Sequence, residues 1–267
     1  MLYLCKKIIV MQQELILGID VGGTGVKGGL VDVSTGKMIS ERFRVKTPKP
    51  ANVKAVTEAF CEIVKHFDWK GNIGVGFPSI ISNGVAKTAA NIDKDWIGAN
   101  IETVLGDASG CTIYTLNDAD AAGIAELYFG AADGQEGLTI MLTLGTGIGS
   151  ALFMDGVLMP NTEFGHLNID DLIAEKYCSD AVRKKSGMAW EEYGKRLNRY
   201  FKHLDRVFSP DLIVLGGGGS KEFASYKDFL KHPVKVTTAQ MLNNAGIVGA
   251  AYYAYHKANK MRLKGVI

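Results

Sequence analysis

The sequence has little that would place it in a membrane, in an oxidising compartment or on nucleic acid. None of its apolar runs reaches the roughly 18 residues that a membrane-spanning helix needs. Its four cysteines lie far apart and none has metal-site spacing, so they predict reduced thiols in a cytoplasmic protein. The formal net charge of +2 is too small to indicate nucleic acid or an anionic membrane as a partner.

The first residues also lack the features of an export signal. MLYLCKKIIVM is apolar with two lysines, but it has neither a long apolar core nor a small-residue cleavage site. We therefore expect residues 1–14 to be an extension before the folded part. Met11 is an equally good starting point for the chain.

Two common nucleotide-binding motifs are absent as well. The chain has no G-x-x-x-x-G-K-[ST] run, which excludes a P-loop. GGTGVKGG leads into a second strand-like run rather than a helix, and its spacing differs from G-x-G-x-x-G. The pattern does not indicate a Rossmann dinucleotide site.

What the chain does contain is a repeated glycine–threonine turn. GGTGVKGGL (Gly22–Leu30) is echoed by GTGIGSAL (Gly145–Leu152), and each copy follows a strand-like apolar run. Such a turn exposes backbone N–H groups and lets a large anion approach without obstruction by a Cβ. One copy alone could be a hairpin turn that needs positive φ. The repeat and a third cluster, LGGGGS (Leu215–Ser220), favour phosphate binding instead.

The residues predicted to hold phosphate come from these three clusters. Lys27 is included because a point charge beside such a turn suits a phosphate, although it could be an ordinary solvated lysine. The full set is Gly22, Gly23, Thr24, Gly25, Lys27, Gly145, Thr146, Gly147, Gly217 and Gly218.

Both halves of the chain show the same order of elements: meander, helix, strand, helix. The later strands are expected at 72–77, 111–116 and 211–215. The helices are expected at 53–67, 118–131, 190–208 and 244–258, with a glycine-led helix after GGGGS. This order predicts two similar α/β domains flanking a cleft. We place the smaller domain at 15–116 and the larger at 117–249, and a closing helix at about 250–264 can pack back on the first domain.

Acidic residues stand where two of these strands end. Asn117 and Asp118 lie between a strand and a helix, where an α/β fold exposes functional groups, but either could equally be the helix N-cap. The helix N-terminus favours an ionised carboxylate, so we expect a low pKa for Asp118. Asp20 ends the first strand in an apolar run; it either has a partner or faces solvent.

TEFGH (Thr162–His166) follows the second meander. Glu163 and His166 carry polar ends that can hold several sugar hydroxyls by charge-assisted bonds. A lone histidine in a loop is otherwise usually structural. Trp96 in NIDKDW could pack on a sugar face or fill the core.

DVGGTGVKGG, LGTGIG, TEFGH and LIVLGGG together resemble the ROK sugar kinases, members of the actin-like ATPase-domain (ribonuclease H-like) superfamily. Six segments are similar, in order, to the polyphosphate glucokinase subgroup: TAANIDKDWIG, NDADAAGIAE, LTLGTGIGSALF, PNTEFGHL, SPDLIVLGGGGSK and NNAGIVGAA. The resemblance covers about Leu17 to Ala251. Any one of these motifs is weakly specific for the family, but six of them in the same order are strong evidence of the resemblance.

This resemblance implies an enzyme that transfers a phosphoryl group to the 6-hydroxyl of glucose. It implies Asp118 as the catalytic base and Asp20 as the acid that helps to position hydrated Mg²⁺. The implied sugar-binding residues are Asn91, Asp93, Asn117, Glu163, His166 and Glu175. Most ROK proteins carry a Cys-rich zinc motif after Glu-x-Gly-His. Only Cys178 follows here, so no zinc is expected.

The subgroup match implies inorganic polyphosphate as the phosphoryl donor. Lys27, Lys87 and Lys94 are candidate contacts for a polyanion, or simply solvated lysines. LGGGGS could provide a slot for adenosine, so ATP is an alternative donor. Relatives are often dimers, which makes a homodimer an expectation here.

Three rival interpretations remain on the sequence. An ATP-dependent ROK kinase could act on glucose or on another hexose such as mannose or N-acetylglucosamine. A sugar-sensing repressor would need a helix-turn-helix ahead of Leu15, where only about 14 residues stand. An actin-like ATPase that binds a protein partner is disfavoured by the sugar motifs TEFGH and NIDKDW.

Overall fold

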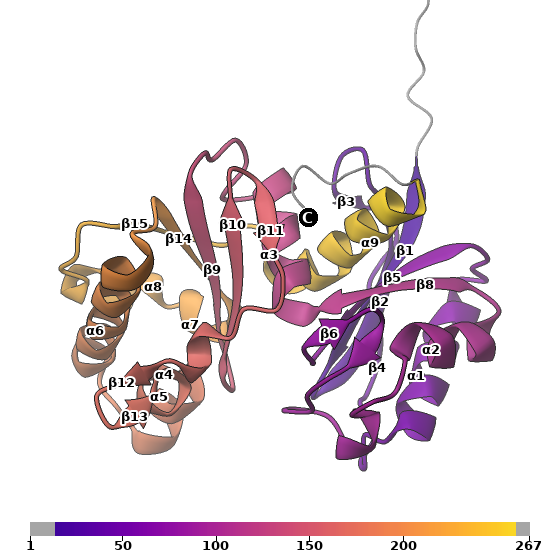
Figure 1. Cartoon of the computed structure of the whole chain (residues 1–267), viewed down its shortest axis with the longest axis horizontal. Helices are drawn as coiled ribbons and strands as arrows, with labels where there is room; N and C mark the ends of the chain where they lie inside the picture. The colour runs from indigo at the N-terminus through magenta and orange to yellow at the C-terminus, as the bar shows by residue number, and fades with distance from the viewer. Residues whose placement is uncertain (1–13, 260–267) are drawn as a thin grey trace, which may run out of the picture.

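The computed structural model describes residues 14–259. The expected N-terminal extension, except for Glu14, and the last residues of the expected closing helix lie outside this range. Figure 1 shows two lobes, each built around a β-sheet, with a pair of helices between them.

The first sheet combines antiparallel hairpins with parallel strands. Its strand order is β3 (Lys37–Met38), β2 (Gly25–Asp32), β1 (Leu15–Gly22), β5 (Asn72–Phe77), β8 (Thr112–Asn117), and β4 (Phe43–Val45) also pairs with β2. β1 and β2 are antiparallel, whereas β1, β5 and β8 run parallel. Parallel neighbours need a crossover connection. Helix α1 (Val53–His66) lies in the crossover that leads to β5.

The second sheet repeats this topology. Its order is β11 (Val157–Met159), β10 (Ile148–Met154), β9 (Leu138–Leu144), β14 (Leu212–Gly216), β15 (Lys235–Thr238). The β9–β10 pair is antiparallel and the β9–β14–β15 strands are parallel, as in the first sheet. Two like α/β units therefore make up the described chain, which confirms the predicted actin-like fold.

Each sheet is covered by helices on its outer face. α1 and α2 (Ile101–Ser109) pack on the first sheet around Phe60 and Leu105. α6 (Trp190–Phe208) packs on the second sheet through Leu197, Phe201 and their neighbours. These apolar stripes on amphipathic helices bury the sheets from outside.

The space between the sheets is filled by α3 (Asp118–Phe129) and α9 (Ala245–Ala258), which contact each other closely (Figure 1). α9 also packs on β1, β5 and β8 of the first sheet. Gly249 makes the helix crossing tight, because a Cβ there would overlap the carbonyl of Ala121. The chain therefore returns from the second lobe to the first through α9.

The remaining elements are short. They are β6 (Ile81–Ser82), β7 (Val85–Ala86), β12 (Asn168–Ile169), β13 (Leu172–Ile173), α4 (Ala174–Cys178), α5 (Asp180–Ser186), α7 (Gly217–Ser220), α8 (Phe223–Tyr226) and four 3₁₀ turns (Lys94–Trp96, Phe164–His166, Lys227–Phe229, Leu242–Asn244). Trp96 is fully buried, so it is a core residue. Within residues 14–259, no helix has the length and apolar character to cross a bilayer.

Candidate active site

Asp118 stands where β8 ends and α3 begins. Asn117 is the N-cap of α3: its Oδ1 accepts from the amides of Ala119 and Asp120 at 2.8 and 3.2 Å. Its Nδ2 donates to the carbonyl of Ser79 at 3.1 Å. Asn117 thus takes the capping role, and Asp118, the first helical residue, is left to face the space between the lobes.

The expected low pKa of Asp118 is wrong. Burial and the nearby carboxylate of Asp20 raise the pKa of Asp118 to about 7, with Glu163 adding to the rise. The amide of Ala119 donates to its Oδ1 at 2.8 Å and opposes this rise. A helix terminus lowers a carboxyl pKa by a modest amount, and here the loss of water around the charge outweighs it.

Two cavities meet at Asp118. The main cavity, of about 490 Å³, lies between the lobes and is lined by ten of the predicted site residues: Asn91, Asn117, Asp118, Gly145, Thr146, Gly147, Glu163, His166, Glu175 and Gly217. Its volume is within the usual range for a small-molecule site. Residues from both halves of the sequence therefore converge on one cleft.

The side cavity, of about 280 Å³, opens on the other side of Asp118. It is lined by Asp20, Lys27, Gly217 and Gly218 among the predicted residues, together with Asp118 itself. Lys27 Nζ donates to Asp20 Oδ2 at 3.0 Å, so the acid in the apolar strand does have a partner. Asp118 and Gly217 line both cavities, so the two spaces are adjacent.

The glycine at position 145 is explained neither by backbone conformation nor by packing. Its φ lies outside the left-handed region, and a Cβ built on it would meet no described protein atom within 4 Å. The residue nevertheless lines the main cavity. A glycine with open space above it lets a ligand approach the backbone closely, which fits the predicted phosphate turn.

The polar wall opposite Asp118 is formed by the TEFGH segment. His166 Nδ1 lies 3.3 Å from Glu163 Oε2. Burial raises the pKa of Glu163, while His166 lowers it and the nearby carboxylate of Glu175 raises it further. Glu175 itself is paired with Lys176 at 3.2 Å. A carboxylate and an imidazole held together in this way can bind neighbouring sugar hydroxyls.

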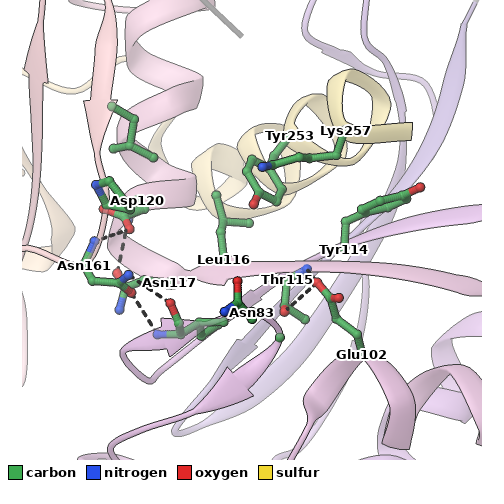
Figure 2. Close-up of a pocket in the computed structure, with 14 residues that line it drawn as sticks. Asn83, Glu102, Tyr114, Thr115, Leu116, Asn117, Asp120, Asn161, Tyr253 and Lys257 are labelled. Atoms are coloured by element: carbon green, nitrogen blue, oxygen red, sulfur yellow. Dashed lines mark hydrogen bonds between the residues drawn. The ribbon is translucent and has the colours of Figure 1, made fainter. Parts of the chain in front are cut away.

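Asn161 links this wall to the opposite side of the cleft. Its Oδ1 accepts from the amide of Ile81 at 2.8 Å, and its Nδ2 donates to the carbonyl of Ile81 at 2.9 Å. Its own amide donates to Asp120 Oδ2 at 2.8 Å. Figure 2 shows Asn161 beside Asp120 and Asn117 at the edge of a further cavity behind β8. Sequence reasoning missed this residue, although it immediately precedes TEFGH.

Five predicted residues line neither the main nor the side cavity. Gly22, Gly23, Thr24 and Gly25 form the β1–β2 hairpin beside the cleft. The carboxylate of Asp93 accepts from the amide of Asp95 at 3.2 Å and caps the turn at Lys94–Trp96. Sequence reasoning also missed the cavity residues Ser79, Thr88 and Asn243, although Thr88 begins the segment TAANIDKDWIG and Asn243 begins NNAGIVGAA.

The side cavity suits a divalent cation held partly by phosphate. Mg²⁺ binds proteins through one or two carboxylates and completes its shell with water and phosphate oxygens. Asp20 and Asp118 offer two such carboxylates at one cavity. Within residues 14–259, no cluster of three or more His, Cys, Asp or Glu side chains could hold a metal by itself. The phosphate would have to supply further ligands.

Comparisons with known proteins agree with this geometry. The profile of the ROK family matches residues 16–182. The polyphosphate glucokinase of Mycobacterium tuberculosis (strain CDC 1551 / Oshkosh) is 43% identical over 235 residues, which cover 88% of this chain and 89% of that protein. The polyphosphate glucokinase of Mycobacterium leprae is 40% identical over 88% of this chain and 72% of its own length.

Solved structures show the same relationship. An inorganic polyphosphate/ATP-glucomannokinase from Arthrobacter sp. strain KM matches with a TM-score of 0.87 and 44% identity, over 91% of this chain and 99% of that one. A ROK family glucokinase from Streptomyces griseus, solved with glucose and AMPPNP, shares the fold with a TM-score of 0.74 and 24% identity over 91% and 100%. The predicted resemblance is confirmed: this chain belongs to the ROK family.

Proposed function

We propose that this enzyme transfers a phosphoryl group from inorganic polyphosphate to the 6-hydroxyl of glucose, with ATP as a second donor. One observation carries the proposal: Asp118 lines both cavities. The main cavity has the polar side chains proposed to bind a sugar, and the side cavity has Lys27 with Gly217 and Gly218 of the LGGGGS cluster. An acceptor in the first space and a donor in the second would meet at the carboxylate of Asp118. The relatives that this chain resembles over most of their length are polyphosphate glucokinases and a glucomannokinase.

In the acceptor site, Asn91, Glu163 and His166 hold the sugar hydroxyls, and Asn117 and Glu175 complete the wall. Asp118 accepts the proton of the 6-hydroxyl as the new bond to phosphorus forms. A base with a pKa of about 7 is suited to this at neutral pH, because it is partly ionised and still basic. Sugar binding by Asp93 stays a prediction, because its carboxylate caps the 3₁₀ turn at Lys94–Trp96.

The donor phosphates would be bordered by the backbone of Gly217–Gly218 in the side cavity and by that of Gly145–Gly147 in the adjoining part of the main cavity, and Lys27 lies next to Asp20. Asp20 would hold Mg²⁺ with its waters, and the ion would neutralise charge on the transferred phosphate. No zinc is part of this proposal. Phosphoryl transfer depends mainly on such positioning and charge stabilisation.

We also expect this reaction to take place in the cytoplasm, and the enzyme to form a homodimer. The free thiols of Cys61, Cys111 and Cys178 are consistent with a reducing compartment. Mannose is a second candidate acceptor, because the Arthrobacter relative is a glucomannokinase.

The test is an assay of the purified chain against a matrix of donors and sugars. Glucose, mannose and N-acetylglucosamine are each combined with polyphosphate and with Mg·ATP, and kcat/KM is measured for every pair. We expect the highest value for glucose with polyphosphate. A preference for ATP with no polyphosphate activity would leave an ATP-dependent ROK kinase.

A further inference from the structure

Two arginines lie outside the site described so far: Arg44 on the edge strand β4 of the first sheet, and Arg42 just before this strand. In Arg42–Phe43–Arg44–Val45, the cations alternate with apolar residues. Phe43 and Val45 pack against the core under α1, whereas Arg42 and Arg44 are exposed. Because successive side chains along a strand point to opposite faces, Arg44 lies on the face away from α1.

The sheet register connects Arg44 to the catalytic cleft. Arg44 on β4 pairs with Lys27 on β2, and Lys27 pairs with Asp20 on β1. Asp20 pairs with Gly76 on β5, and a Cβ at Gly76 would lie 3.6 Å from Asp118 Cα. Directly paired residues share one face of a sheet. A row therefore runs from Asp118 through Asp20 and Lys27 to Arg44.

Only part of the positive charge along this row is paired with a carboxylate in residues 14–259. Like charges directly opposite each other on paired strands are destabilising, and Lys27 faces Arg44 in this way. Asp20 neutralises Lys27. Within residues 14–259, no carboxylate forms an ion pair with Arg42 or Arg44. An anion bound above the row would remove the repulsion.

Both guanidinium groups are held in place by backbone carbonyls. Arg44 Nη2 donates to the carbonyl of Thr24 at 2.6 Å, and Arg42 Nη1 donates to that of Asn243 at 3.3 Å. Asn243 lines the side cavity, so Arg42 contacts a residue of its wall. These bonds use one nitrogen of each group, and a guanidinium has five N–H donors in all.

Gly25 gives Arg44 the room to lie over the hairpin turn. A Cβ at Gly25 would overlap the Arg44 guanidinium, and Gly25 does not need a left-handed φ. From the sequence, we expect Gly25 to leave room for a phosphate. In the structure the room holds a cation that can itself bind phosphate.

We propose that Lys27, Arg44 and Arg42 form a track that binds the polyphosphate chain behind the phosphoryl group being transferred. The inference rests on the proposed function and adds the residues that would favour polyphosphate over ATP. Neighbouring strands are about 4.8 Å apart, so the row extends roughly 10 Å from Asp20 to Arg44. A polyphosphate carries charge along this whole distance, whereas ATP ends in an uncharged nucleoside after three phosphates.

The test compares both donors on the same variants. In Arg42→Gln/Arg44→Gln, we expect the KM for polyphosphate to rise about tenfold or more, because charge-assisted hydrogen bonds are lost. The KM for Mg·ATP and for glucose should change less than about twofold, because neither ATP nor glucose is expected to contact Arg42 or Arg44. The steep salt dependence of polyphosphate binding should also flatten, because fewer counterions are released.

Three controls separate charge from structure. Arg206→Gln removes one charge from an exposed position on α6, at the far end of the molecule (Figure 1), and should leave both donors unaffected. Arg44→Lys keeps the charge and should retain most of the polyphosphate affinity. Arg42→Gln alone remains testable if the double variant does not fold.

Direct binding makes the result independent of turnover. Calorimetry with polyphosphate, tripolyphosphate and inorganic phosphate, without glucose, should show affinity that grows with chain length in the wild type and grows less in the double variant. An unchanged polyphosphate affinity, or an equal loss for polyphosphate and ATP, would overturn the track. A wild type that binds polyphosphate through these residues but phosphorylates no sugar would contradict the proposed function alone.

Discussion

Two opposing effects decide the protonation of Asp118. The N-terminus of α3 and the amide of Ala119 favour the carboxylate, while burial and Asp20 favour the neutral acid. Burial and Asp20 have the larger effect, and the pKa of Asp118 rises to about 7. Asp120, two residues on, is also buried, and its pKa is raised to about 7 for the same main reason. Asp118 in the cleft and Asp120 at the cavity behind β8 therefore both have raised pKa values, and perturbed pKa values are common at catalytic sites.

Asp118→Asn should abolish most turnover while glucose still binds. The amide is close in shape to the acid, so the fold and the sugar contacts remain, but it cannot accept the proton. Loss of a general base typically costs about 10²–10⁴ in rate. The measurement is kcat by coupled assay and glucose affinity by calorimetry. A variant with near wild-type kcat would show that another group is the base.

The raised pKa of Asp118 also predicts how stability depends on pH. A carboxyl with an unfolded pKa of about 3.9 and a folded pKa of about 7 holds its proton more tightly in the folded state. The stability from this proton is complete below about pH 4 and is lost as the pH rises through about 7. Asp118→Asn should therefore raise the melting temperature more at pH 8 than at pH 5. An equal shift at both pH values would contradict the raised pKa.

Gly145→Ala tests the role of the open glycine. The new Cβ meets no described protein atom, and the φ of Gly145 does not need glycine, so the melting temperature should stay within about 1–2 °C. A phosphate close to the backbone would meet the methyl group. We therefore expect a higher donor KM with an unchanged glucose KM. If both donors were used as in the wild type, no phosphate would approach this position.

Residues that belong to a sequence motif were predicted to lie together in the site. Ten of the predicted residues line one cavity, because each stands at a strand end or in a turn that the fold brings there. Arg44 and Asn161 could not be found this way. Their roles depend on which strand pairs with β2 and which loop reaches Ile81, and one sequence does not contain these non-local pairings.

At the scale of elements, long periodic segments were predictable and short ones were not. The helices at Val53–His66 and Trp190–Phe208 and the strand at Asn72–Phe77 match their expected ranges to within a residue. The helix at Ile101–Ser109 was not predicted, because this segment has an internal Gly106 and buries only Ile101 and Leu105. The glycine-led segment after β14, expected to form one helix, forms two separate four-residue helices, α7 and α8, and a 3₁₀ turn at Lys227–Phe229 follows before β15.

Gly249→Ala should weaken the contact between α3 and α9. The added Cβ would overlap the carbonyl of Ala121, so the two helices must move apart. Overpacking of this kind costs about 1–3 kcal/mol of folding free energy. In a protein of this size that lowers the melting temperature by several degrees. Gly145→Ala is the matched control, and equal melting temperatures for the two variants would show that the helix crossing tolerates a side chain.

At the scale of the whole molecule, two like lobes are joined through α3 and α9 and by the side chain of Asn161 (Figures 1 and 2). The proposed sugar ligands come from both sides: Asn91 from the first lobe, Glu163 and His166 from the second. A sugar that contacts both lobes binds best when they are close together. Closure would also exclude water, which competes with the sugar as a phosphoryl acceptor.

We therefore expect glucose to shift the molecule towards a closed state that Asn161 already favours. Opening must break its two hydrogen bonds to Ile81. At about 1 kcal/mol each, their loss changes the closed-to-open ratio by a factor of about 30. Asn161→Gly keeps a backbone that suits the φ of 62° and removes the side chain that makes these hydrogen bonds. Without glucose, this variant should have a larger radius of gyration than the wild type.

Small-angle scattering with and without saturating glucose measures this effect. The wild type should compact slightly on binding, and Asn161→Gly should compact more, with a glucose KM raised several-fold by the cost of closing. Asn83→Gly is the matched control, because Asn83 has a φ of 52° and its exposed side chain makes no hydrogen bond within residues 14–259. If glucose changed the scattering of neither the wild type nor Asn161→Gly, the lobes would not move, and the hydrogen bonds of Asn161 would serve only the fold.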